Sequence, residues 1–193
     1  MLNSLEPGGM VKWVTFFSQT GSEIAALSKK LNRVPDLLVT NNRPTKLRTI
    51  SPALLDLGVP LVILPNKPDL VDYVQTLRQT DADPINTLIT LHGWLRVVPK
   101  EIIQEYPYIF NGHPGLIDKY PQLKGKDPQK KAWDLDLPTS GCVIHKVTEG
   151  VDEGTIYRSK EVAIRNLNMD EMFARLHETS IELWASFLKR HWL

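Results

Sequence analysis

The sequence predicts an α/β fold of the Rossmann-like type, with helices flanking a mostly parallel, twisted sheet and an antiparallel extension near the C-terminus. Two observations predict it. Strand-like and helix-like segments alternate along residues 11–107, and the segments 139–150 and 154–164 have the pattern of a hairpin. No repeat, low-complexity tract or internal linker interrupts this order. We therefore expect one domain over residues 11–193, after a flexible leader of residues 1–10.

The first half of the chain supplies the parallel part of the sheet. Residues 11–18 are rich in β-branched and aromatic residues, and residues 21–33 place apolar side chains at helical spacing. Short, almost continuously apolar runs follow, which are typical of strands covered on both faces, at 35–42, 60–64 and 86–92. Helix-like segments with Ser-Pro or Pro-Asp starts separate these runs, at 51–58 and 68–79. Such alternation predicts ligands beyond the C-terminal strand ends.

The second half changes character. Residues 99–107 predict a further helix, and the segments 139–150 and 154–164 alternate like strands with one exposed face. A short turn holding Val151, Asp152 and Glu153 joins these strands. An apolar stripe predicts a long closing helix from about Met169 to His191. The intervening segment GLIDKYPQLKGKDPQ is expected to be a solvated loop, or else to form a binding site for an anion through Lys124 and Lys126.

Composition is ordinary for a folded, soluble chain. Of the 193 residues 42% are apolar and 23% are charged, which permits one well-buried core. Lys plus Arg (23) nearly balances Asp plus Glu (22), so no overall charge favours a nucleic acid partner. A local basic patch remains at residues 124–131 (KGKDPQKK).

Cysteine and membrane signals point to the cytoplasm. The single Cys142 excludes an internal disulfide and a cysteine-cluster metal site, as in a reducing compartment. No apolar run reaches the roughly 18 residues that a membrane span needs, and residues 1–10 do not resemble a signal peptide. His92, His113 and His145 lack a metal-binding spacing, so we expect no metal.

The turn SQTGSE at residues 18–23 follows the first strand and opens the first helix. Helix-start N–H groups, with Gly21 and Ser22, suit an anion or another substrate group. The alternative is structural, because Thr20 and Glu23 fit a capping box in which Glu23 serves only the backbone. The sequence contains neither a G-x-x-x-x-G-K-S/T loop nor a G-x-G-x-x-G motif, so nucleoside triphosphate and dinucleotide binding have no support.

The stretch FNGHPGLI, residues 110–117, holds the strongest catalytic candidates. Its glycines and proline predict that Asn111 and His113 sit on an exposed turn, with both side chains pointing the same way. Turn chemistry also explains each of these residues, and Asp152, without any catalytic role. Together they supply an amide donor, an imidazole and a carboxylate, the set that stabilises an oxyanion and moves a proton in acyl transfer. Cys142 is expected to be buried, and His145 to face the other side or pack near the sheet.

These residues resemble a known family. FNGHPGLI is similar to the Asn-x-His-Pro-Ser-Leu-Leu signature of folate-dependent formyltransferases, and GCVIHKVTEGVDEGTIY resembles their Gly-Cys-x-x-His-x-Val and x-x-Asp-x-Gly-x-Ile segment. LHGWLRVVPKEIIQEYP resembles the strand, folate loop and helix before the signature, and SQTGSEIAAL resembles the phosphate-binding turn of the glycinamide ribonucleotide enzymes. The family also includes methionyl-tRNA and sugar N-formyltransferases. The resemblance covers most of residues 11–188, in order.

The resemblance implies 10-formyltetrahydrofolate as co-substrate and a primary amine as acceptor. It implies that Asn111 and His113 stabilise the tetrahedral intermediate, while Asp152 pairs with His113 and helps to relay the proton. The residues that it assigns to the folate pocket are Trp94, Leu95, Arg96, Val97, Val98 and Val151. The turn that it matches to the acceptor site contains Gly21, Ser22 and Glu23. Lys124 and Lys126 are further acceptor candidates, from a segment in which the chain departs from the family, and we expect the acceptor to be a small molecule.

Departures from the family pattern concern the acceptor. Gln19 and Glu23 replace the Gly and Asn of the phosphate-binding turn, and a carboxylate beside a phosphate repels it. The family's acidic ribonucleotide contact falls near Ser180, with Glu178 displaced by two positions. The insertion-like segment with Lys124 and Lys126 replaces the usual Ser-Leu-Leu-Pro. We therefore expect an acceptor other than glycinamide ribonucleotide, for example an amino sugar, a nucleotide-linked amine or a modified-base amine.

Other functions stay open at this point. Methionyl-tRNA is disfavoured as acceptor, because no C-terminal barrel follows and little basic excess is available for RNA. A formyltetrahydrofolate hydrolase would use the same three residues to activate water, although related hydrolases carry an N-terminal regulatory domain. A non-catalytic folate- or nucleotide-binding protein would not need a proton relay. Both a monomer and a homodimer are compatible with the sequence.

Overall fold

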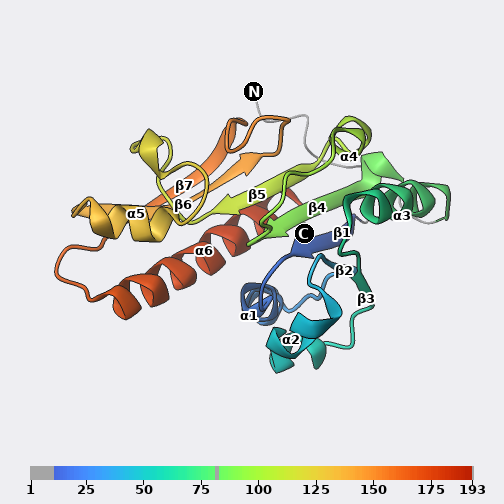
Figure 1. The fold of residues 1–193 in the computed structure, drawn as a ribbon, viewed down its shortest axis with the longest axis horizontal. Coiled ribbons are helices and arrows are strands. Elements are labelled where there is room, and N and C mark those ends of the chain that lie inside the picture. Colours follow the sequence, from blue (N-terminus) through green and yellow to red (C-terminus); the bar gives the residue numbers. More distant parts are fainter. Residues whose placement is uncertain (1–10, 81–82, 193) are drawn as a thin grey trace.

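A computed structural model of the chain describes residues 11–80 and 83–192. Seven strands form one sheet in the order β3-β2-β1-β4-β5-β6-β7 (Figure 1). The first five strands pair in parallel, and β6 and β7 continue the sheet in antiparallel fashion. Their bounds are β1 Lys12–Phe17, β2 Leu37–Thr40, β3 Leu61–Ile63, β4 Thr87–His92, β5 Ile109–His113, β6 Thr139–Lys146 and β7 Ile156–Ala163. This confirms the predicted fold class.

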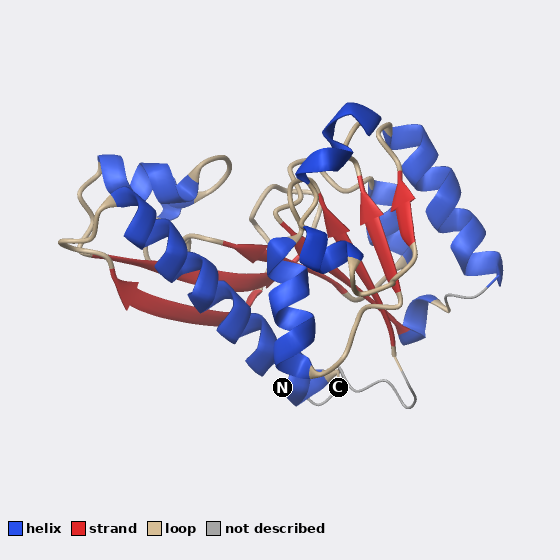
Figure 2. Cartoon of the chain, turned by 90° about the horizontal axis from the view of Figure 1, so that it is seen from below, coloured by secondary structure: helices blue, strands red, loops and turns tan. Residues whose placement is uncertain are grey.

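Helices lie on both faces of the sheet (Figure 2). On one face, α1 and α6 bury Leu27 and Trp184 against Trp13 of β1. On the other face, α3 and α4 bury Val74 and Ile102 among side chains of β1 and β4. The helix bounds are α1 Ser22–Leu31, α2 Pro52–Leu55, α3 Lys67–Thr80, α4 Lys100–Glu105, α5 Pro128–Asp134 and α6 Met169–His191, with short 3₁₀ helices η1 Pro44–Thr49, η2 Pro84–Asn86 and η3 Pro121–Leu123.

The alternation of side chains along each strand fixes which face a residue serves. In β1, Trp13 packs with the α1 and α6 side, while Val14 and Phe16 pack with the α3 and α4 side. Strands β2 and β4 are buried along their whole length, as their continuous apolar runs predict. Strand β3 is only partly buried, because it forms the edge of the sheet and has one neighbouring strand.

The antiparallel ribbon differs from the prediction in one respect. Strand β7 alternates between more and less buried positions, but β6 is buried on both faces, so the expected exposed face of β6 is wrong. One face of β6 packs on α6 through Cys142 and Ile144. Val143 packs in one cluster with Leu116 and Leu123 from the segment expected to be a solvated loop, and with Ala132 just after it. That segment instead contains η3 and the start of α5, beside the ribbon (Figure 1).

The predicted flexible leader, residues 1–10, lies outside the described residues. The closing helix runs over Met169–His191, as predicted, and Asn168 and Glu171 form a capping box at its start. None of the helices in the described ranges is long and apolar enough to span a bilayer.

Candidate active site

Asn111 and His113 lie within β5, so the expected exposed turn is wrong. Strand β5 continues to His113 because it is paired on both sides, with β4 and with β6. The chain leaves the sheet only at Pro114. The two side chains share one face, as predicted, while the position between them must be glycine: a Cβ on Gly112 would lie 2.4 Å from Trp184 Nε1 of α6. This packing places Asn111 and His113 on the face opposite α6.

Asp152 reaches His113 from the turn between β6 and β7. The Asp152 backbone is left-handed, with φ 54°, which aspartate tolerates in tight turns. Its Oδ2 lies 3.4 Å from His113 Nδ1 and accepts a hydrogen bond from the Gly125 N–H at 2.8 Å. The structure therefore brings together the three residues that the sequence singled out, and the Asp152 side chain is nearly buried between them.

His145 belongs to the same cluster, which the sequence analysis missed. Its Nε2 lies 3.1 Å from Asn111 Nδ2 and 3.3 Å from Asp152 Oδ1, so the expectation that it faces elsewhere is wrong. In the β5–β6 pairing, Asn111 stands directly opposite His145, and the pairing with β7 shifts between Ile144 and His145. A register drawn between the two strands would have revealed this pair.

The ring nitrogens of His113 have different surroundings. Nε2 lies 2.9 Å from the Leu123 carbonyl, which only accepts, so Nε2 carries a proton. Burial lowers the pKa of His113 below its ordinary value, although the neighbouring Asp152 and the Leu123 carbonyl act to raise it. The neutral ring therefore presents an unprotonated Nδ1 towards Asp152.

Asp152 is ionised in this setting. Burial acts to raise its pKa, but the hydrogen bond from His145, the nearby His113 and the Gly125 N–H outweigh burial and lower the pKa to about 2. An imidazole with a lowered pKa beside a stable carboxylate is a common arrangement for proton transfer. Once His113 gains a proton at Nδ1, Asp152 stabilises the resulting charge.

The segment that contains η3 contacts this cluster through its backbone. The Leu123 carbonyl binds His113, and the Gly125 N–H binds Asp152. The Lys124 and Lys126 side chains are exposed, and Lys131 Nζ donates to the Lys124 carbonyl at 2.5 Å. No described contact joins either lysine to the catalytic side chains, so their assignment to the acceptor stays a prediction.

The predicted folate loop, residues 94–98, leaves β4 next to β5. Trp94 and Val98 pack inward, with Trp94 5.3 Å from the Phe16 ring centroid. Leu95 and Val97 are 61% and 62% exposed, and Val151 beside Asp152 is 56% exposed. The exposed Arg96 donates to the Pro65 carbonyl, and the Leu95 N–H donates to Ser18 Oγ at 2.9 Å. Exposed apolar side chains near polar catalytic groups are typical of a ligand wall.

The predicted capping box at residues 20–23 is wrong. Gly21 is the N-cap of α1, with φ 67°, and no side chain caps the helix there. Thr20 Oγ1 instead accepts the Ser22 N–H at 3.2 Å. Glu23 turns towards the sheet, where Oε1 lies 2.8 Å from His92 Nδ1 and Oε2 accepts from Ser180 Oγ at 3.2 Å. The wrong expectation arose because the tertiary partners of Glu23 are distant in sequence.

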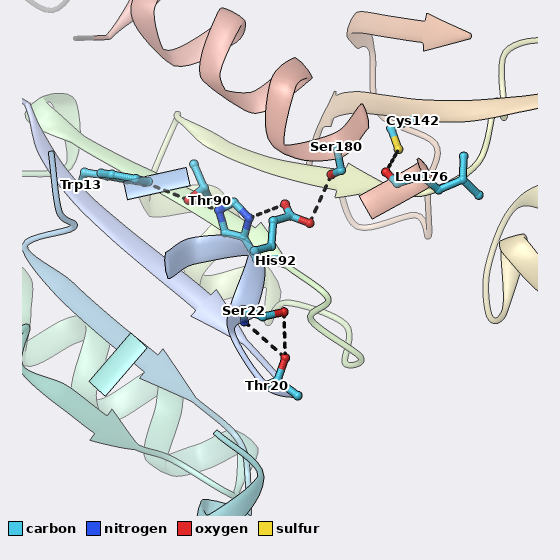
Figure 3. Close-up of polar contacts among 9 residues, drawn as sticks. Trp13, Thr20, Ser22, Thr90, His92, Cys142, Leu176 and Ser180 are labelled. Atoms are coloured by element: carbon cyan, nitrogen blue, oxygen red, sulfur yellow. Dashed lines mark hydrogen bonds and ion pairs between the residues drawn. The ribbon is translucent and has the colours of Figure 1, made fainter. Parts of the chain in front are cut away.

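A chain of polar contacts joins Trp13, Thr90 and His92 (Figure 3) and ends at Glu23. Trp13 Nε1 donates to Thr90 Oγ1, and that hydroxyl lies 2.9 Å from His92 Nε2. The Glu23 carboxylate only accepts hydrogen bonds, so His92 Nδ1 carries the proton that binds it.

Cys142 and the metal-ligating residue types show no sign of a catalytic or metal-binding role within the described ranges. Cys142 is buried as predicted, its Sγ lies 3.3 Å from the Leu176 carbonyl, and burial raises the pKa of its thiol. Within the described ranges, no group of His, Cys, Asp and Glu is arranged to hold a metal ion.

The fold and the Asn111–His113–Asp152 cluster together define an α/β protein with an acid–base site of the kind that acyl transfer requires. A family model described as formyl transferase matches residues 11–187. The chain therefore belongs to the formyl transferase family, which confirms the resemblance noted in the sequence.

Curated relatives match parts of the chain. It is 37% identical over 100 residues to a Drosophila melanogaster trifunctional purine biosynthetic protein adenosine-3, covering 51% of this chain and 7% of that protein. It is 29% identical over 105 residues to a Bacillus subtilis phosphoribosylglycinamide formyltransferase, covering 53% of this chain and 52% of that protein. A Bifidobacterium longum methionyl-tRNA formyltransferase is 26% identical over 156 residues, covering 80% of this chain and 45% of that protein. The matches thus span about half or less of these relatives.

Solved structures share the fold. The phosphoribosylglycinamide formyltransferase of Anaplasma phagocytophilum aligns with a TM-score of 0.78 at 23% identity, over 94% of this chain and 86% of that one. The phosphoribosylglycinamide formyltransferase of Streptococcus pneumoniae aligns with a TM-score of 0.77 at 24% identity, over 94% of this chain and 98% of that one. At such identities the likeness establishes the fold alone.

Proposed function

We propose that this protein transfers a formyl group from 10-formyltetrahydrofolate to a primary amine of a small molecule. Family membership supports formyl transfer. The observation that carries the proposal is the convergence of Asn111, His113 and Asp152 at the carboxyl end of β5, beside an exposed apolar loop. In open α/β sheets this edge is where ligands bind.

Asn111 has the role of oxyanion donor. The amine lone pair attacks the formyl carbon, a new C–N bond forms, and the carbonyl oxygen becomes an oxyanion. Asn111 Nδ2 lies 3.1 Å from His145 Nε2, a contact that holds the amide in place before the reaction. A fixed donor stabilises the developing negative charge without reorganisation.

His113 and Asp152 move the proton. The attacking nitrogen loses a proton to the unprotonated Nδ1 of His113, and Asp152 stabilises the imidazolium. The proton then passes to the departing folate nitrogen as its bond to the formyl carbon breaks, which leaves tetrahydrofolate and the formamide. This reaction needs neither a covalent enzyme intermediate nor a redox step.

The folate lies, in this proposal, against residues 94–98 and Val151. Leu95, Val97 and Val151 offer apolar surface, and the backbone of the loop offers polar groups to a pterin. Trp94 and Val98 support the loop from the core. Lys124 and Lys126 belong to the acceptor side, together with Gly21, Ser22 and Glu23. We also propose that the protein works in the cytoplasm as a monomer or homodimer, on an acceptor that is not nucleic acid.

Folate absorbance tests the function directly. The pure protein is incubated with 10-formyltetrahydrofolate alone, and then with a panel of amines that includes glycinamide ribonucleotide and amino sugars. We expect tetrahydrofolate to be released only in the presence of a particular amine. Release without any amine would instead identify a hydrolase, and tight folate binding without release under any condition would indicate a binding protein.

A further inference from the structure

Strand β5 separates two sides of the proposed site. Asn111 faces His145 and the side on which the folate loop packs, whereas Gly112 faces Trp184 of α6. His92 pairs in register with Gly112, and its ring lies 4.8 Å from the Trp184 ring centroid. Glu23 is bound to His92, so its carboxylate stands on the α1 and α6 side, opposite the folate loop.

Two donors fix the Glu23 carboxylate in place. Within the described residues they are the His92 imidazole at 2.8 Å and the Ser180 hydroxyl at 3.2 Å. Carboxylate oxygens only accept hydrogen bonds, so the group held in this way offers a ligand acceptors alone.

The carboxylate also keeps accepting capacity for a ligand. An ionised carboxylate offers about four lone-pair positions, of which His92 and Ser180 occupy one on each oxygen. The Glu23 side chain is 20% exposed, so part of it reaches solvent. A partly buried charge acts more strongly on a neighbouring group than a charge in open water does.

The neighbouring turn has one N–H group fewer to offer an anion. The Ser22 N–H, which would otherwise be available at the start of α1, donates to Thr20 Oγ1 at 3.2 Å. A phosphate at this turn would face both an occupied amide and the Glu23 charge. A hydroxyl or an ammonium group would instead find a fixed acceptor.

We propose that Glu23 determines acceptor specificity: it binds a hydrogen-bond-donating group of the acceptor, a hydroxyl or a second ammonium, and excludes acceptors with a phosphate at that position. The inference builds on the formyl transfer proposed above and narrows its substrate class. His92 and Ser180 are positioning residues, since they act by holding the carboxylate.

Binding of inorganic phosphate is the first test, because it does not depend on turnover. Dissociation constants are measured by ³¹P NMR for the wild type, for Glu23→Gln, and for a control variant, Glu178→Gln. The control removes an exposed carboxylate from α6, whereas Glu23 lies on α1. We expect Glu23→Gln to bind phosphate about tenfold more tightly than the wild type, and Glu178→Gln to match the wild type. Equal binding by wild type and Glu23→Gln, including no binding to either, would overturn the proposal.

Matched amine pairs supply the second test. Formyl transfer is compared for glycinamide riboside and glycinamide ribonucleotide, and for glucosamine and glucosamine 6-phosphate. We expect the wild type to prefer the unphosphorylated member, and Glu23→Gln to lower that preference about tenfold. A comparison of the rates with glucosamine and with 1,4-diaminobutane then shows whether Glu23 binds a hydroxyl or an ammonium group of the acceptor. A wild-type preference for the phosphorylated members, or an unchanged ratio in Glu23→Gln, would refute the assignment.

The two tests show separately whether the proposed formyl transfer fails and whether the proposed role of Glu23 fails. If no amine is formylated, the proposed function fails, while phosphate binding still decides whether Glu23 excludes anions. If amines are formylated without regard to phosphate, the function stands and the role of Glu23 fails. Glu23→Asp keeps the charge on a shorter side chain and is expected to retain the exclusion of phosphate. Matching far-UV spectra and melting temperatures verify that all variants are folded.

Discussion

Two histidine–carboxylate pairs stand at the same edge of the sheet, on neighbouring strands and opposite faces. His113 at the end of β5 faces Asp152 at 3.4 Å, and His92 at the end of β4 faces Glu23 at 2.8 Å. Both imidazoles are buried. The pairs nevertheless differ in the third partner of each ring, which is a hydroxyl for His92 and a backbone carbonyl for His113.

The third partner of His92 is the Thr90 hydroxyl at Nε2, and the nitrogen that faces Glu23 carries a proton because a carboxylate only accepts. The third partner of His113 is the Leu123 carbonyl, which requires the proton on Nε2 and leaves Nδ1 bare towards Asp152. In our proposal His92 holds a carboxylate in place, whereas His113 gains a proton during the reaction. The same residue types would then form a positioning pair and a catalytic pair.

Removal of the catalytic pair gives the largest expected effect. His113→Ala and Asp152→Ala should each lower formyl transfer by about a thousandfold or more, because proton transfer and imidazolium stabilisation are lost. Steady-state rates with saturating folate and amine measure this loss. Glu153→Ala next to Asp152 and His177→Ala on α6 are matched controls with exposed side chains, and should retain activity. Retained turnover in both active-site variants, with unchanged far-UV spectra, would remove the catalytic assignment.

Asn111→Ala should lower the rate on the order of a hundredfold, the usual cost of losing one oxyanion donor. The loss should appear in kcat, because the contact matters most once charge develops on the oxygen. His145→Phe provides the comparison, since it removes the group that contacts Asn111 while leaving the amide itself in place. A rate within a few-fold of the wild type for Asn111→Ala would mean that the oxyanion lies elsewhere.

The sequence predicted the sheet and the candidate trio because their signals are local. Continuous apolar runs identified β2 and β4, the motif around β5 identified Asn111 and His113 as candidates, and the turn between β6 and β7 identified Asp152. The errors concern contacts between distant residues. His145 enters the site through strand pairing, and Glu23 leaves its expected helix cap because His92 and Ser180 bind it. The packing of η3 and α5 against β6 was also not predicted, because the segment that contains η3 has weak periodicity in its apolar residues.

Acid should affect the pair of His113 and Asp152. Burial lowers the folded-state pKa of His113 below its ordinary value of about 6.5. The unfolded chain therefore binds more protons just below that pH, so stability decreases as the pH falls. Asp152, with a pKa of about 2, adds a second loss as the pH falls below about 4.

Two measurements test this pH dependence. The rate should drop roughly tenfold per pH unit once His113 becomes protonated. Urea midpoints at pH 7.5 and 5.5 should differ more for the wild type than for His113→Gln. A His113→Gln protein with the same pH dependence of stability as the wild type would show that His113 does not gain its proton in this range.

Trp94→Ala tests whether the two faces of the site bind different substrates. Trp94 packs on Phe16 and supports the exposed Leu95 and Val97, so its loss should raise the KM for folate by about tenfold. The KM for the amine should change much less, since Glu23 lies on the opposite side of β5. Trp133→Ala on α5 is a control for the loss of a partly exposed indole. Equal increases in both KM values would contradict a division between the faces.

His92→Ala should change kcat least of all and thereby sharpen the contrast with His113. Its removal takes one hydrogen-bond partner from Thr90 and one from Glu23, which should cost about 1–3 kcal/mol of stability in urea unfolding. The amine KM should increase because Glu23 is no longer held, while kcat stays within about threefold, since His92 takes no proton in the reaction. Ser180→Ala should act in the same direction with a smaller loss of stability, because one contact at 3.2 Å is removed. A kcat loss in His92→Ala as large as that in His113→Ala would mean that both pairs take part in proton transfer.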